Sequence, residues 1–134
     1  MKRKEAEALV GSRVSAWTSA NGCYVGTLIE VYGSPWRGKV RITGTTKVAV
    51  PFEAGRATQR RGFREGDVIE VGGSNVKPTD EEGVTYLQAL RGELAVYEGY
   101  LARLASGKMR ESDRWWVQRG FEEISKQIER ENQR

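Results

Sequence analysis

Histidine is absent from the 134-residue sequence, cysteine occurs once and proline occurs three times. Without histidine, the chain lacks the usual general base at neutral pH and the commonest metal ligand. The single cysteine, Cys23, allows neither an intramolecular disulfide nor a cysteine-based zinc site. We therefore expect a non-catalytic protein without metal or other cofactor, in a reducing, cytoplasmic setting.

Long hydrophobic runs are missing as well. The longest apolar stretches are a few residues, far short of the ~20 residues that span a bilayer. The basic start of the chain is followed by acidic residues rather than by the apolar region of an export signal. We expect no membrane partner. With 38% hydrophobic and 30% charged residues, the composition is typical of one compact domain or two small lobes.

The two parts of the chain differ in hydrophobic periodicity. Residues 13–76 carry short β-branched and aromatic runs separated by Gly and Asn, whereas the residues after Thr79 are rich in helix formers. This change predicts an α+β fold, with a five-stranded small β-barrel over residues 1–78 and an antiparallel α-helical hairpin over residues 79–134. The expected strands are 13–18, 23–32, 38–50, 67–71 and 75–77.

Local signals add detail to the predicted barrel. Asn21–Gly22 favours a type I′ turn, because both residue types tolerate positive φ, and so predicts antiparallel pairing of the first two strands. A short helix over residues 4–10, ended by Gly11, would place apolar side chains over one mouth of the barrel. These side chains are Ala6, Leu9 and Val10.

Two helices are expected in the second part. Thr79 and Glu82 have the spacing of a capping box, which predicts that the first helix starts there. Ser106–Gly107 ends it, and a second helix begins near Ser112 or Asp113. Apolar residues recur at spacings of three and four and predict that the helices pack on each other. They are Leu87, Leu90, Leu94, Tyr97, Leu101 and Leu104 on the first helix, and Val117, Phe121, Ile124 and Ile128 on the second.

A stripe of small residues follows an adjacent face of the first helix: Gly92, Ala95, Gly99 and Ala102. A glycine inside a helix costs ~1 kcal/mol relative to alanine, so we expect another surface to press closely against this stripe. The barrel, the second helix and another copy of the chain are the alternatives. The last would make the stripe an oligomer interface.

Positive charge is concentrated in the first part of the chain. Residues 1–80 have a net charge of +5 and residues 81–134 a net charge of −1. Because arginine offers a bidentate fork to phosphate and aromatic rings can stack on bases, this pattern predicts a surface that binds RNA or DNA. The candidate residues are Arg37, Lys39, Arg41, Arg56, Arg60, Arg61 and Arg64, with Trp36, Tyr32 and Phe63 as the nearby aromatics.

Three segments carry a resemblance to a known family. An N-terminal helix followed by Gly11-Ser12-Arg13-Val14, then residues 21–28 (Asn-Gly-Cys-Tyr-Val-Gly-Thr-Leu), and later residues 71–76 (Val-Gly-Gly-Ser-Asn-Val) resemble the Sm-like proteins. These are ring-forming RNA-binding members of the SH3-like barrel group. The resemblance covers residues 4–77 and implies a barrel of that type. The family's base-holding positions fall on Tyr32 and Trp36 and on Gly72–Gly73, where this sequence departs from the family's residues.

Other functions compete with nucleic-acid binding. The acidic residues Glu65, Asp67 and Glu70 do not form a paired-carboxylate or metal-binding pattern. The sequence therefore gives little support for an enzymatic function. The chain could instead be a protein-interaction or oligomerisation adaptor that acts through its helical hairpin. A third alternative is capture of a small anionic, nucleotide-like ligand, with Trp36 or Phe63 covering the base.

Overall fold

The computed structural model describes residues 1–18, 21–50, 52–53, 56–57 and 62–134, and the side chains of all of these except 52–53 and 56–57. Its contacts divide the chain into two compact units. Unit 1 consists of Met1–Ala49 and Gly62–Tyr86, and unit 2 of Val50–Arg61 and Leu87–Arg134. Each unit therefore contains two separate pieces of sequence. The domain limits 1–78 and 79–134 stay a prediction.

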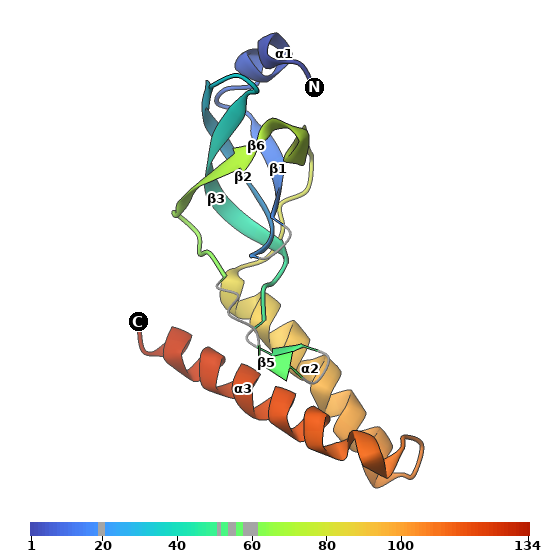
Figure 1. The fold of residues 1–134 in the computed structure, drawn as a ribbon. Coiled ribbons are helices and arrows are strands. Elements are labelled where there is room, and N and C mark those ends of the chain that lie inside the picture. The colour runs from blue at the N-terminus through green and yellow to red at the C-terminus, as the bar shows by residue number, and fades with distance from the viewer. Residues whose placement is uncertain (19–20, 51, 54–55, 58–61) are drawn as a thin grey trace. The chain divides into compact units, whose positions relative to one another are not determined.

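Unit 1 is built on a five-stranded antiparallel sheet (Figure 1). The strands are β1 (Arg13–Thr18), β2 (Gly22–Tyr32), β3 (Arg37–Lys47), β6 (Val68–Gly72) and β7 (Val76–Pro78), in the order β6-β3-β2-β1-β7. A single 3₁₀ turn, η1 (Gly73–Asn75), connects the two edge strands β6 and β7. The predicted α+β fold, an N-terminal five-stranded sheet followed by a helical hairpin, is confirmed.

Alternation along the strands places the core of unit 1 on one side of the sheet. Val40 and Ile42 of β3 are buried, while Arg37, Lys39 and Arg41 project from the opposite face, as the period of two requires. The remaining buried members of this core come from the other four strands of the sheet: Val14, Ala16, Tyr24, Leu28, Ile69, Val71 and Val76.

The short helix α1 (Arg3–Ala8) packs beside this core. Ala6 is fully buried and Leu9 packs against the core cluster, but Val10 is 46% exposed. The predicted helix is therefore present, and of its three apolar residues Val10 points to solvent. Gly11 follows with a φ of 91°, the left-handed conformation that commonly ends a helix.

The first two strands pair as predicted, but the connection between them differs from the predicted two-residue turn. β1 and β2 are antiparallel, and Thr18 pairs with Gly22. The connection is therefore longer than a two-residue Asn21–Gly22 turn, and Gly22 is the first strand residue, with a φ of 92°. A Cβ at Gly22 would lie 2.5 Å from the carbonyl oxygen of Lys47, which is a second reason for glycine at this position.

Unit 2 contains the helical hairpin. Helices α2 (Tyr86–Ala105) and α3 (Arg114–Asn132) run side by side in opposite directions (Figure 1), and the 3₁₀ turn η2 (Glu111–Asp113) precedes α3. A small ladder of β4 (Phe52–Glu53) and β5 (Arg56–Ala57) belongs to the same unit, with β4 next to α3. Among the described residues, no helix combines the length and the apolarity needed to cross a bilayer.

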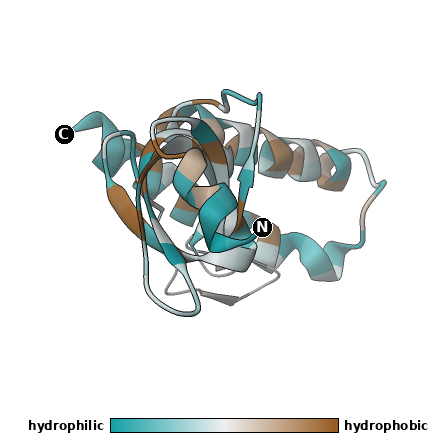
Figure 2. Ribbon diagram, turned by 90° about the horizontal axis from the view of Figure 1, so that it is seen from above, coloured by the Kyte–Doolittle hydropathy of each residue, from teal (hydrophilic) through white to brown (hydrophobic). Residues whose placement is uncertain are grey.

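The predicted apolar seam forms the core of the hairpin. Hydrophobic and hydrophilic residues alternate along both helices (Figure 2). The buried members are Tyr97, Leu104, Val117 and Ile124, with Leu94, Leu101, Phe121 and Ile128 packed against them. Gly120 of α3 lies in close contact with α2, because a Cβ there would lie 2.2 Å from the ring of Tyr97.

The start of α2 differs from the prediction. Thr79 Oγ1 accepts a hydrogen bond from Glu81 N at 3.1 Å, but the helix begins only at Tyr86. The intervening segment instead pairs with β3, since Thr45 and Val84 exchange backbone hydrogen bonds of 2.7 and 2.9 Å. The capping-box prediction is wrong because a long-range pairing takes these residues out of the helix.

Candidate functional site

The outward face of β3 carries the first group of predicted binding residues. Lys39 Nζ lies 3.2 Å from Glu30 Oε2 and 5.7 Å from the centre of the Tyr32 ring. The hydrogen bond and charge of Glu30 raise the pKa of Lys39. Glu70 stands opposite Lys39 on β6. The ammonium group of Lys39 is therefore largely compensated by neighbouring carboxylates.

Arg37 and Arg41 flank Lys39 on the same face and are exposed. Among the described residues, no carboxylate oxygen lies within 4.0 Å of either guanidinium group. These two arginines can therefore offer their donors to an external anion without first breaking an internal ion pair.

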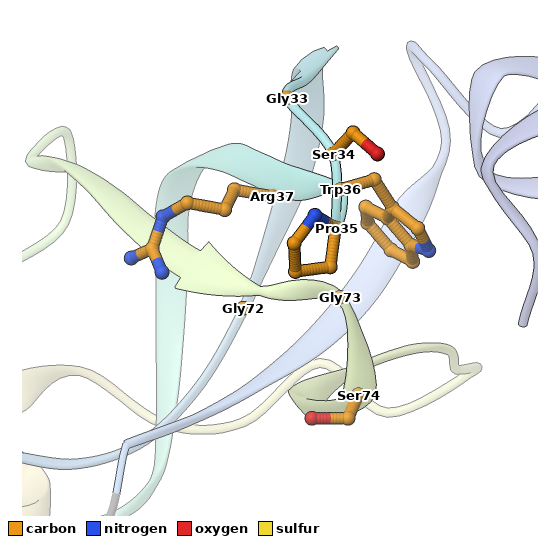
Figure 3. A pocket seen from close by; sticks show the side chains of 8 residues that line it. All are labelled: Gly33, Ser34, Pro35, Trp36, Arg37, Gly72, Gly73 and Ser74. Atoms are coloured by element: carbon orange, nitrogen blue, oxygen red, sulfur yellow. The ribbon is translucent and has the colours of Figure 1, made fainter.

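A depression opens beside Arg37, between the β2–β3 loop and the β6–η1 junction (Figure 3). Its volume is ≈ 540 Å³, within the range of small-ligand sites. None of the described residues that line it carries a carboxylate. The lining residues are Gly33, Ser34, Pro35, Trp36, Arg37, Gly72, Gly73 and Ser74.

Glycine at position 73 allows the two sides of the depression to meet. Gly73 N donates to the carbonyl oxygen of Trp36 at 3.0 Å, and a Cβ at Gly73 would lie 2.3 Å from the indole. At Gly72, by contrast, a Cβ would meet nothing within 4 Å. The backbone of Gly72 therefore leaves the floor of the depression open.

The three predicted stacking aromatics have different surroundings. Trp36 is half-buried, packs against the core of unit 1, and donates from Nε1 to the carbonyl oxygen of Met1 at 3.0 Å. Tyr32 is half-buried on the outward face beside Lys39. Phe63 packs against the core and meets Tyr24 edge to face, with ring centres 5.7 Å apart. Only Trp36 lines the depression.

The predicted basic loop 56–64 is divided between the two units, and its assignment as a binding surface together with the β3 arginines stays a prediction. Arg56 lies on β5, its side chain is not described, and it belongs to unit 2. Arg60 and Arg61 lie outside the described residues. Arg64 belongs to unit 1 and is half-buried, and its backbone N–H donates to Asp67 Oδ2 at 2.9 Å.

The division into units also redistributes the charge. Unit 1 holds ten Lys and Arg against nine Asp and Glu, a net charge of +1. Unit 2 holds twelve against nine, a net charge of +3. The excess of +5 counted over residues 1–80 therefore does not belong to unit 1 alone.

Two of the acidic residues singled out in the sequence, Glu65 and Asp67, accept backbone hydrogen bonds. Glu65 accepts a hydrogen bond from Tyr86 N, and Asp67 accepts one from Arg64 N. Within the described residues there is no group of three or more Cys, Asp or Glu that could hold a metal ion. That Ser74 lines the depression was not apparent from the sequence, although Ser74 belongs to the segment 71–76 that carried part of the family resemblance.

The small-residue stripe of α2 is exposed. Gly92, Ala95, Gly99 and Ala102 all face solvent, and a Cβ at either glycine would meet no described atom within 4 Å. Among the described residues of unit 2, the close helix contact is made instead by Gly120 on α3. The expectation that the second helix presses on the stripe is therefore wrong, and the assignment as an oligomer interface stays a prediction.

Comparison with solved structures finds a similar fold. The chain resembles kinase-associated protein B from Bacillus cereus, with a TM-score of 0.61 over 93% of this chain and 97% of that chain. The sequence identity is 17%, a level that supports likeness of fold alone. No family model matches the chain, the Sm-like family included, and no curated protein matches it. The coarser part of the family resemblance, a small β-sheet protein with helices, is what the comparison supports.

Proposed function

We propose that this chain is a non-catalytic protein that binds single-stranded nucleic acid at the depression of unit 1. The observation that carries the proposal is the meeting of Trp36–Arg37 with Gly72–Ser74 around one opening. Trp36 and Gly72–Gly73 stand at positions that the Sm-like resemblance associates with holding a base, although their residue types differ from those of the family. These residues line the same depression as the guanidinium group of Arg37, which has no carboxylate partner among the described residues. This arrangement supports a ligand that combines a negative charge with a planar, hydrogen-bonding group.

Different residues around the depression would contact different parts of the ligand. Arg37 and Arg41 can each hold a phosphate through a bidentate fork. The glycine floor leaves space for a planar group, and the exposed Ser34 and Ser74 can bond with its polar edge. Lys39 contributes less, because it would have to leave Glu30 to reach a phosphate.

The number of available arginines limits the expected affinity. Two phosphate contacts correspond to a slope of about −1.4 for the logarithm of the binding constant against the logarithm of salt concentration. This salt dependence is weaker than all seven predicted basic residues would give if each contacted a phosphate. Binding should therefore be easiest to detect at low salt.

The test is a salt titration with a short, labelled single-stranded oligonucleotide, followed by fluorescence anisotropy. We expect Arg37→Gln to reduce the magnitude of the slope by about 0.7 and to weaken binding at low salt. Lys47→Gln is the matched control, because it removes the same charge at the opposite end of β3. Equal effects of the two variants, or no binding by the unaltered chain at low salt, would contradict the proposal.

The same titration separates an oligonucleotide from a small ligand. A mononucleotide has one phosphate group, and Arg41 does not line the depression that it would occupy. If a mononucleotide binds as tightly as the oligomer and Arg41→Gln has no effect on either ligand, the anionic small-molecule alternative is favoured over nucleic acid.

A second candidate function is favoured by the exposed stripe of α2. The glycines Gly92 and Gly99 each cost ~1 kcal/mol inside a helix, and no described contact of this chain offsets that cost. A second helix packed on the stripe would do so. The structural neighbour is described as kinase-associated, which is consistent with an adaptor that acts by binding a protein.

Light scattering coupled to size-exclusion chromatography tests the adaptor in its homo-oligomeric form. If copies of the chain pair through the stripe, Ala95→Glu should convert the oligomer to monomer while Glu98→Gln, off the stripe on the same helix, leaves it unchanged. A monomer at all concentrations would remove self-association and leave only a different protein as the partner.

A further inference from the structure

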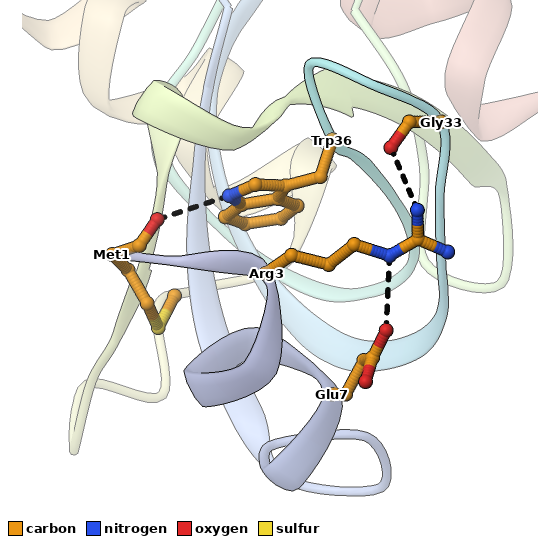
Figure 4. A network of polar contacts seen from close by, with 5 residues as sticks. All are labelled: Met1, Arg3, Glu7, Gly33 and Trp36. Carbon is orange, nitrogen blue, oxygen red and sulfur yellow. Dashed lines mark hydrogen bonds and ion pairs between the residues drawn. The ribbon is translucent and has the colours of Figure 1, made fainter.

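The β2–β3 loop, which forms one wall of the depression, is held in place largely by the first residues of the chain (Figure 4). Arg3 Nη1 donates to the carbonyl oxygen of Gly33 at 3.0 Å. Trp36 Nε1 donates to the carbonyl oxygen of Met1 at 3.0 Å. Gly33 and Trp36 both line the depression, whereas Arg3 and Met1 do not.

Arg3 is itself fixed on its far side. Its Nε lies 2.9 Å from Glu7 Oε1, one turn further along α1. One guanidinium group therefore joins the helix to the loop, with Glu7 on one edge and Gly33 on another. An arginine suits this bridging position because its planar fork presents several donors at fixed angles.

The helix that carries Arg3 is anchored to unit 1. Ala6 is fully buried and Leu9 packs against the core. Just beyond the helix, Gly11 N donates to Leu28 O at 2.7 Å, and Leu28 N donates to Ser12 O at 3.1 Å. The position of Arg3 is therefore set by the sheet, and through Arg3 the sheet sets the position of the exposed loop residues 33–35.

We infer that Arg3 is a positioning residue for the proposed binding site, which holds the 33–36 loop and the Trp36 indole in the conformation that the ligand requires. The inference rests on the proposed function, because it names a residue that controls that site without lining it. When Arg3 is lost, Gly33 loses its partner and the wall of the depression moves, so a ligand must reorder the wall when it binds. The loss of one solvent-exposed hydrogen bond of ordinary net strength corresponds to a weakening of binding of about threefold to tenfold.

Arg3 could also favour a polyanion simply through its positive charge. Two further variants distinguish this explanation from the positioning of the 33–36 loop. Lys4→Ala removes the same charge from α1, and among the described residues its side chain has no hydrogen-bond or ion-pair partner. Glu7→Ala removes a negative charge, which by Coulomb's law alone would strengthen the binding of a polyanion. If Arg3 acts by positioning, Glu7→Ala weakens binding instead, because Arg3 loses the partner that holds it toward Gly33.

The experiment measures oligonucleotide affinity by anisotropy and the indole N–H resonances of the free protein by NMR, with Trp36→Phe used to assign the Trp36 signal. We expect Arg3→Ala to weaken binding about threefold to tenfold and to shift the Trp36 resonance. Glu7→Ala should change both measurements in the same direction. Lys4→Ala should leave the Trp36 resonance in place and should weaken binding less than Arg3→Ala does.

Two results overturn the inference. One is an unmoved Trp36 resonance in Arg3→Ala. The other is an affinity that falls equally in Arg3→Ala and Lys4→Ala, or that rises in Glu7→Ala. Failure of the proposed function is recognised separately, because the unaltered chain would then bind no oligonucleotide at low salt, and Arg3 would have no ligand affinity to control even if the Trp36 resonance moves.

Discussion

The backbone N–H of Tyr86, the first residue of α2, donates to Oε1 of Glu65 at 2.6 Å. Glu65 lies 21 residues earlier in the chain, so the start of the helix is capped by a carboxylate from another part of unit 1. The negative charge also interacts favourably with the N-terminal end of the helix dipole. This contact fixes where a helix of 20 residues begins.

We expect Glu65→Ala to lower the free energy of unfolding by about 1 kcal/mol, the usual loss when a helix N-terminus loses its side-chain acceptor. Glu65→Gln keeps an acceptor without the charge and should cost less. Glu81→Ala is the control, since Glu81 contributes its backbone N–H rather than its carboxylate. Urea denaturation of the three variants gives the comparison, and equal stability of Glu65→Ala and Glu81→Ala would show that the cap contributes nothing.

Two helical glycines should respond oppositely to alanine. At Gly120 a methyl group would overlap the ring of Tyr97, so Gly120→Ala should destabilise the hairpin by about 1–2 kcal/mol, because the cost of overpacking exceeds the gain in helix propensity. At Gly99 a methyl group meets no described atom within 4 Å, so Gly99→Ala should stabilise a monomeric chain by about 0.5–1 kcal/mol. Thermal unfolding monitored by circular dichroism measures both. Destabilisation by Gly99→Ala would indicate that a close partner covers the stripe.

Tyr24 should ionise later than an ordinary tyrosine. Burial raises the pKa of its hydroxyl to about 12, an effect that the hydrogen bond from Phe63 N only partly opposes. Because the folded state holds this proton more tightly than the unfolded state, the associated stability is fully present below pH ~10 and is lost as the pH rises toward 12. A spectrophotometric titration should show a late tyrosine ionisation near pH 12 that is missing in Tyr24→Phe. Ionisation of all tyrosines near pH ~10 in the folded protein would contradict the expectation.

Cys23 should react slowly with alkylating reagents. Burial raises the pKa of its thiol, and the positive charge of Lys47 offsets only part of this effect. Because the thiolate is the reactive form, iodoacetamide at neutral pH should modify the folded chain more slowly than the same chain in urea. Mass spectrometry of timed samples measures both rates, and equal rates would mean that the fold does not protect the thiol.

The sequence was a good guide wherever local periodicity decides the structure. The strand 13–18 was predicted with its observed bounds, and the seam of Leu94, Leu101 and Phe121 packs as its three–four spacing indicates. Long-range contacts explain what was missed. Val84 pairs with Thr45 and delays the helix, and Glu30 compensates Lys39 across the sheet. No short window of sequence contains either relationship.

The candidate site was only partly predictable for the same reason. Arg37 and Arg41 were found by alternation along one strand, and the structure confirms that they share a face. That Trp36 would meet Gly73 depends on the connection from β6 through η1, which places two distant segments side by side. The direction of Phe63, toward Tyr24 and the core, likewise depends on a residue 39 positions away.

The polypeptide passes from one unit to the other three times, after Ala49, before Gly62 and after Tyr86. Neither unit can therefore be excised by a single cut, and a gene fragment ending at residue 78 would carry twelve residues that belong with the hairpin and would omit the segment that pairs with β3. Recombination or gene fusion would have to transfer the two units together. If the two units have different functions, those functions are therefore inherited together. Binding studies should use the full-length chain rather than a fragment of it.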